Sequence, residues 1–316
     1  MNLTSKEQVM TVSTLNINQL LCQADRLVKD IIYQRINISQ VSIQLTALYL
    51  PIIYSADSNL CYSQTINAFI GSGYVAAGYC LPEELVWDHL RTSYFMKLIQ
   101  DNYKLPIINS ELQFQQQEQN NRLSLQEYLS CLFNHYAKLL VVRVDLGYAK
   151  ETVNQVSIYD FEAHLKTLRD LISNKKTCFE HLEGYTWAIE QGFDRGFHCH
   201  LLLIYQGNDR QKDTYLGQAV GEKWQAITNS LGSYFNCNDP AYKKLFAHCN
   251  QLGLGMVHRD SPVNNVTAEN AINMALYLTE PSKTDQAMKV TVQGMRSFGH
   301  GQYRTSKRRG LPPISK

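Results

Sequence analysis

Two strand-like stretches joined by a short turn, within residues 185–207, constrain the fold of this 316-residue chain more than any other feature. The stretches YTWAIEQ and FHCHLLLIYQG are rich in aromatic and aliphatic residues, which favour strands. The GFDRG segment between them holds the glycines and aspartate that favour a chain reversal. We therefore expect an antiparallel β-hairpin here.

The second stretch carries two histidines at alternate positions. Strand side chains alternate between faces, so His198 and His200 share one face and Cys199 points to the other, where it cannot join them as a ligand. Two imidazoles on one face can bind a single cation if a third ligand comes from elsewhere. Glu190 would be this third ligand if it pairs across from either histidine, because directly paired residues share a face. A register slip of one residue would place Glu190 on the other face. Asp145 is a second candidate.

The alternative is that both histidines are ordinary residues of a half-buried sheet, hydrogen-bonded to their neighbours. That alternative does not explain why Glu190, a carboxylate, lies at the tip of a strand that packs mostly apolar residues. The position of Glu190 therefore favours the metal site.

The segments around the hairpin predict its fold class. Further strands are expected at 138–148 and 256–262, and helices at 159–173, 213–230 and 267–280. The last helix should stop at Pro281, because a residue before proline avoids the α conformation. This order predicts an α+β domain with an antiparallel sheet covered by helices.

The preceding part of the chain is predicted to be mainly helical. Apolar residues at helical spacing mark 14–34 as a helix. A second helix is expected at 82–101, where Pro82 and the acids Glu83 and Glu84 are typical of a first helical turn. The Gln/Asn-rich segment 111–126 is interpreted as a linker or an exposed helix. We divide the chain accordingly into an N-terminal helical region of unknown role (1–125), a sheet domain (126–300) and a basic tail (301–316).

The net charge of only +2 hides an uneven distribution. Residues 1–137 hold 8 Lys and Arg against 11 Asp and Glu, whereas residues 138–316 hold 22 against 17. Residues 289–316 carry seven cations and no side-chain carboxylate. Such asymmetry hints at nucleic-acid or membrane contact, although a basic tail can also serve solubility alone.

The compartment is predicted from what the chain lacks. Its first residues have no apolar core of a signal peptide, and no run of 18 apolar residues occurs, so we expect no membrane span. The eight cysteines are widely spaced and form no Cys-x-x-Cys motif. We interpret them as reduced, mostly buried thiols of a cytoplasmic protein.

A tyrosine stands out on the last predicted helix. The apolar stripe of that helix contains Ala271, Ala275 and Leu276, and at about 100° per residue Tyr277 falls on the opposite side. A core tyrosine would lie on the stripe, so Tyr277 is predicted to face outward in the last turn. It is either a surface tyrosine or a presented nucleophile.

Five separated segments of the chain occur together in a characteristic order. They are VVRVDLGY (141–148), YTWAIEQGFDRGFHCHLLLIY (185–205), VGEKW (220–224), VHRD (257–260) and ALYLTE (275–280). Together they resemble a known family, the inovirus-type replication proteins, which bacterial prophages represent by the YagK/YfjJ C-terminal domain. The resemblance covers roughly residues 138–300.

Members of this family resemble HUH endonucleases. The resemblance implies an RRM-like antiparallel sheet and a divalent cation, Mg²⁺ or Mn²⁺, held by His198, His200 and Glu190. It also implies that Tyr277 attacks a phosphodiester of single-stranded DNA at a replication origin, leaving a 5′-phosphotyrosine and a 3′-OH that primes rolling-circle replication in a bacterial host.

Two features depart from the pattern of this family. Members often carry lysine three residues after the tyrosine, where this chain has Glu280; Lys283, beyond Pro281, is the candidate to replace it as a catalytic residue. None of the 19 tyrosines forms a Tyr-x-x-x-Tyr pair, so either a single-tyrosine mechanism is implied or catalysis is impaired.

Cations near both ends of the sheet domain are candidates for contact with DNA phosphates. They are Arg143, Arg296, Arg304, Lys307, Arg308 and Arg309. Two other functions remain open: a DNA-binding regulator that keeps the fold without nicking, favoured by Glu280, and a metalloenzyme acting on a small molecule. Host replication proteins are a further expected class of partner.

Overall fold

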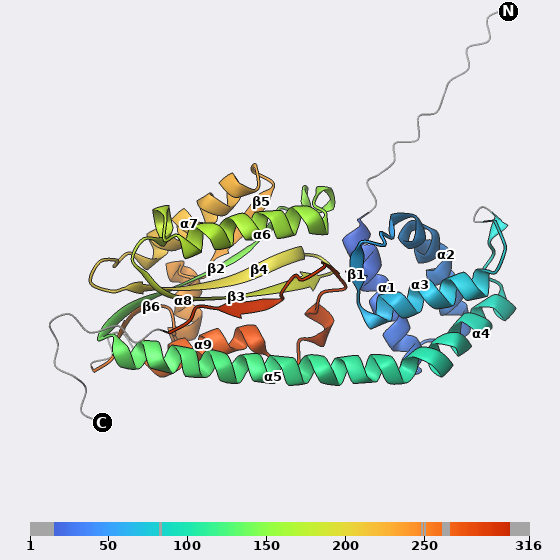
Figure 1. Ribbon diagram of the computed structural model, residues 1–316, viewed down its shortest axis with the longest axis horizontal. Coiled ribbons are helices and arrows are strands. Elements are labelled where there is room, and N and C mark those ends of the chain that lie inside the picture. Colours follow the sequence, from blue (N-terminus) through green and yellow to red (C-terminus); the bar gives the residue numbers. More distant parts are fainter. Residues whose placement is uncertain (1–15, 82–83, 248, 250, 261–265, 304–316) are drawn as a thin grey trace, which may run out of the picture.

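The computed structural model describes residues 16–81, 84–247, 249, 251–260 and 266–303. A group of helices forms one end of the molecule, and a sheet between helices forms the other (Figure 1). The four basic residues predicted to contact DNA from the tail, Arg304, Lys307, Arg308 and Arg309, lie outside the described residues. No helix within the described ranges is long and apolar enough to cross a membrane.

The N-terminal region is helical, as predicted. Its helices are α1 (Ile17–Ile32), α2 (Ile38–Ser55), α3 (Gln64–Ala77) and α4 (His89–Leu98). The predicted helix 14–34 is confirmed as α1. The helix predicted from residue 82 begins only at His89, because the Asp88 side chain accepts a hydrogen bond from the backbone N–H of Arg91 and caps the helix there.

Helix α5 (Lys104–His135) follows α4 after a π-helical turn (Ile99–Tyr103) and runs beneath both parts of the molecule (Figure 1). The Gln/Asn-rich segment 111–126 lies inside this helix, so it is helical and not a flexible linker. The predicted boundary between residues 125 and 126 also falls within α5, and no break in the helix marks it.

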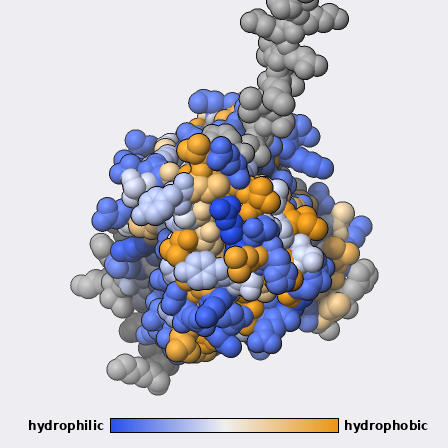
Figure 2. All heavy atoms as spheres, turned by 90° about the vertical axis from the view of Figure 1, so that its right-hand side faces the viewer, coloured by the Kyte–Doolittle hydropathy of each residue, from blue (hydrophilic) through white to orange (hydrophobic). Residues whose placement is uncertain are grey.

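The core of the N-terminal helices is continuous with the core under one face of the sheet. Large apolar side chains nevertheless stay exposed at the helical end, where Figure 2 shows them scattered between polar ones. They include Ile43, Tyr54, Tyr74, Val75 and Tyr79.

The main sheet is antiparallel and its strands have the order β5-β2-β4-β3-β8, with β6 also paired to β2. Its strands are β2 (Lys138–Tyr148), β3 (Leu182–Gly192), β4 (Gly196–Gln206), β5 (Gly232–Asn236), β6 (Gly255–His258) and β8 (Phe298–His300). The hairpin and the strand at 138–148 are confirmed, and the short strand expected at 256–262 ends at His258. A separate pair joins β1 (Leu60–Tyr62) to β7 (Val290–Val292).

Helices cover both faces of the sheet (Figure 1). Helices α6 (Ile158–Ser173) and α7 (Asp213–Ile227) pack on Cys199, Leu201 and Leu203 of β4. Helices α5 and α9 (Ala268–Leu276) pack on the opposite face, against Leu202 and Ile204. The short helix α8 (Pro240–Ala247) also contributes to this second cluster. The predicted α+β class with a helical N-terminal region is therefore confirmed.

Candidate metal centre

The register of the hairpin brings the predicted acid and the histidines together. Glu190 pairs directly with His198, and Ala188 pairs with His200. Directly paired residues share a face, so Glu190 lies on the same face as both histidines. Cys199 is buried on the other face, as the alternation predicted.

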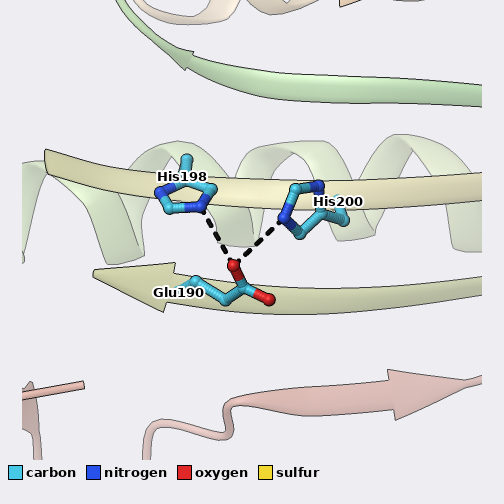
Figure 3. Close-up of side chains that lie close together, drawn as sticks. All are labelled: Glu190, His198 and His200. Carbon is cyan, nitrogen blue, oxygen red and sulfur yellow. Dashed lines mark hydrogen bonds and ion pairs between the residues drawn. The ribbon is translucent and has the colours of Figure 1, made fainter. Parts of the chain in front are cut away.

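The three side chains converge on one another (Figure 3). Glu190 Oε2 lies 3.2 Å from His198 Nε2 and 3.2 Å from His200 Nε2. One ligand atom from each residue lies within 4.8 Å of the others, and all three residues are buried. Protein ligands to divalent metals lie at about 2.0–2.2 Å, so a single ion can contact all three atoms. Two imidazoles and one carboxylate leave further coordination positions open. The group could hold a metal ion.

The second ring nitrogen of each imidazole, Nδ1, contacts an oxygen atom on the side away from Glu190. His198 Nδ1 lies 3.1 Å from the Gly196 carbonyl oxygen, and His200 Nδ1 lies 2.8 Å from Asp145 Oδ1. Such contacts fix ring orientation and increase the basicity of the nitrogen that faces a metal. Asp145, expected as a possible ligand, therefore contacts the far side of His200 and lies outside the converging group.

Opposite charges lie next to one another in the cluster and shift the pKa values of Glu190 and His200. Burial tends to raise the pKa of Glu190, but hydrogen bonds from both histidines and the nearby positive charges hold the pKa well below its usual range. Burial tends to lower the pKa of His200, but its hydrogen bonds to Asp145 and Glu190 raise that pKa. A proton on His200 Nε2 would have to leave before a cation could bind there.

Arg143, predicted to contact DNA, is buried beside this cluster, on the same face of the sheet as Asp145 and His200. Its Nε donates to Asp145 Oδ1 at 3.0 Å, and only 5% of the residue is exposed. Burial tends to raise the pKa of Asp145, but its hydrogen bond with His200 and the charge of Arg143 outweigh burial and hold the pKa well below its usual range. Arg296, by contrast, is exposed and lines a cavity with Arg169 and Trp187 on the edge formed by β3 and β8.

Lys283 connects the cluster to the predicted nucleophile. Its Nζ lies 3.0 Å from Glu190 Oε1 and 4.1 Å from the centre of the Tyr277 ring. Tyr277 follows α9 in a 3-10 turn and is 54% exposed, so the prediction that it faces outward is confirmed. Glu280 lies in the same segment, with Oε2 4.0 Å from Arg122 Nη1.

The tip of the hairpin is anchored by residues that the sequence did not reveal. Gln191, next to Glu190, donates from Nε2 to Asn18 Oδ1 of α1 at 2.7 Å, and Asn18 Nδ2 donates to the Gly192 carbonyl. Buried Lys289 donates to the Gln191 carbonyl and to those of Asp285 and Ala287. The contacts of Asn18 and Lys289 with the hairpin span more than 90 positions, so no local pattern could have indicated them.

The eight cysteines are free, as expected, but only Cys199 and Cys237 are buried, so the expectation of mostly buried thiols was wrong. None of them belongs to the converging group.

Comparison with protein families gives a match over the sheet domain. The model of the YagK/YfjJ C-terminal domain matches residues 108–301, which is more than half of the chain. The match begins within α5, about 30 residues before the segment that showed the resemblance in sequence. No curated protein and no solved structure shows significant similarity to the chain.

Proposed function

The chain belongs to the YagK/YfjJ C-terminal domain family, and on that premise we propose that it is a prophage-type replication protein that nicks single-stranded DNA. The proposal assigns it the chemistry of an inovirus-type HUH endonuclease that starts rolling-circle replication. One observation carries it: an exposed tyrosine and a buried Glu-His-His cluster are connected by a single lysine, Lys283.

In the proposed reaction, Tyr277 is the nucleophile. Its phenol gives up a proton to water as the oxygen attacks phosphorus, and a new P–O bond to the tyrosine forms while the bond to the 3′ oxygen breaks. The leaving oxygen takes a proton from water and becomes a free 3′-OH. A tyrosine of pKa about 10 is a poor nucleophile at neutral pH, so its surroundings must assist.

Residues of the chain supply that assistance. Lys283 places a positive charge against the Tyr277 ring, where in the proposed reaction it would offset negative charge that develops on the phosphate oxygens. Glu190, His198 and His200 would hold a divalent cation, for which we propose Mg²⁺ or Mn²⁺, and Asp145 keeps His200 oriented for it. Such a cation, when bound, would polarise the scissile phosphate as a Lewis acid.

The test is covalent capture of DNA. The full chain is incubated with single-stranded DNA from its own genetic element, labelled at the 3′ end so that the label stays on the fragment joined to the tyrosine, and with Mn²⁺, and adducts are resolved on a denaturing gel. We expect a labelled adduct with the unaltered chain, none with Tyr277→Phe, and an undiminished amount with Tyr215→Phe, a matched exposed tyrosine on α7. Absence of an adduct from the unaltered chain, or equal adduct from Tyr277→Phe, would refute the proposal.

A second candidate is a DNA-binding regulator without nicking activity. Glu280 favours it, because a carboxylate takes the position where relatives often have lysine, and it lines the same cavity as Glu190 and Lys283. A negative charge there opposes a phosphate. This candidate predicts DNA binding that weakens with salt, does not depend on metal, and leaves no covalent adduct.

A further inference from the structure

A cavity of about 520 Å³ opens beside His198, where the sheet ends at the β3–β4 turn. It extends from the cluster across β2 to β5, and its far wall is made by the start of α1 and the 3-10 turn Val153–Gln155. Among the residues proposed for the reaction, only His198 and its neighbour Asp145 line this cavity. The rest of its wall has no role in the proposed reaction.

Two glycines keep the space beside His198 open. A Cβ placed on Gly147 would lie 3.6 Å from His198 Cβ, and one placed on Gly192 would lie 3.6 Å from His198 Cε1. These are ordinary contact distances, so any longer side chain at either position would extend over the imidazole. Because Gly147 of β2 and Gly192 of β3 carry no side chain, there is room for a ligand against the His198 imidazole.

An exposed aromatic residue lies at the other side of this cavity. Phe235 of β5 pairs with Asp145 of β2, so its ring lies on the same face of the sheet as the cluster. The Phe235 residue is 45% exposed. Tyr242 of α8 packs at nearly a right angle to the Phe235 ring, with centroids 5.0 Å apart, which supports that ring from α8. A supported, exposed ring next to a charged site provides a surface for a flat ligand.

The rim of the cavity carries two exposed cations, Lys150 and Arg195. Neither forms an ion pair with another residue of the described ranges. Of the two carboxylates in the lining, Asp145 is paired with Arg143, and Asp194 is exposed in the turn. A ligand that is both flat and anionic suits these residues.

We propose that this cavity is a nucleotide subsite, in which one base of a single strand stacks on Phe235 and the adjoining phosphates contact Lys150 and Arg195. The subsite deepens the proposed function and rests on it for the identity of the strand. A base must be unstacked to lie on an aromatic ring, so the ligand is single-stranded and not duplex. Stacking on a ring tolerates any base, so this subsite provides affinity without sequence preference.

The test measures binding without metal, so that it does not depend on nicking. A fluorescently labelled, mixed-sequence single-stranded oligonucleotide is titrated with the full chain in EDTA, and anisotropy reports the affinity. We expect Phe235→Ala to weaken binding by about 5- to 150-fold and Phe235→Trp to retain it. Tyr54→Ala, which removes an exposed ring on α2 away from the cavity, should leave the affinity unchanged.

A second measurement addresses the cations. Replacing Lys150 and Arg195 by glutamine should reduce the slope of log affinity against log salt by about 1.4, since single strands contribute about 0.7 per phosphate contact. The subsite would be overturned if the unaltered chain did not bind the oligonucleotide or if Phe235→Ala bound it with unchanged affinity. It would also be overturned if Phe235→Ala weakened the binding of duplex DNA as much as the binding of the single strand. If the subsite is overturned while the Tyr277 adduct forms, the nickase proposal survives. If Phe235 contributes to binding as expected but no adduct forms, the chain is a DNA-binding protein without nicking activity.

Discussion

In the first half of β4, around His198 and His200, the two faces of the strand differ sharply although their residues alternate along the chain. His198 and His200 face charged neighbours on one side, and Cys199 between them faces the apolar layer under α6 and α7 on the other. The apolar face depends on packing density, which many residues share. The charged face depends on partners, because each buried charge is stable only while its counter-charge is present.

The charged face therefore behaves as a set. Glu190 is shared by two histidines and Lys283, while Asp145 is shared by His200 and Arg143. Removal of one member leaves another buried charge without its partner. Removal of one apolar side chain leaves a cavity whose cost depends on its size. The predictions below test this difference, from the largest expected effect to the smallest.

Phe161→Ala tests the apolar face. Phe161 of α6 is fully buried and stacks on Phe197 of β4, with ring centroids 5.4 Å apart. We expect a loss of about 3–5 kcal/mol in the free energy of unfolding, measured by chemical denaturation, because a large cavity forms. Metal affinity of the molecules that remain folded should not change. A loss of metal affinity in the folded molecules would show that the two faces are coupled.

Asp145→Asn tests the support of the charged face. The substitution keeps the shape of the side chain but removes the negative charge that orients His200, so we expect metal affinity to fall about 10- to 100-fold by calorimetric titration. Asp194→Asn is the matched control, because that carboxylate lines the neighbouring cavity and is exposed in the hairpin turn. Equal affinity in both variants would remove Asp145 from the role assigned to it.

Cys199→Ala should have the smallest effect. The thiol is buried between the two histidines in sequence but points away from them, and burial raises its pKa, so it stays protonated and does not bind metal as thiolate. We expect less than about 1.5 kcal/mol of destabilisation and no change in metal affinity, measured by the same two methods. A weakened metal site would contradict the separation of the faces.

Much of the site could be predicted because strand and helix geometry is local. The alternation of side chains placed His198 and His200 together and Cys199 apart, and helical periodicity turned Tyr277 outward. The pairing of Glu190 with His198 was conditional on register, since a one-residue slip would have reversed its face. The structure resolved that condition through the short turn of the hairpin.

Other parts had no local signal. The direction of Lys283 after Pro281, the contact of Asp145 with the far side of His200, and the anchoring of Gln191 by Asn18 depend on segments distant in sequence. Strands β5 and β8 are too short to show periodicity, yet β5 supplies Phe235 beside the cluster.

The sequence by itself determined which side chains share a face within a single strand or helix, because backbone geometry repeats every two or 3.6 residues. Only the tertiary structure decided which of those faces meet. Chain connectivity and packing brought Lys283 to Glu190 across 93 positions and opened a cavity beside His198, and no repeating local geometry encodes either contact.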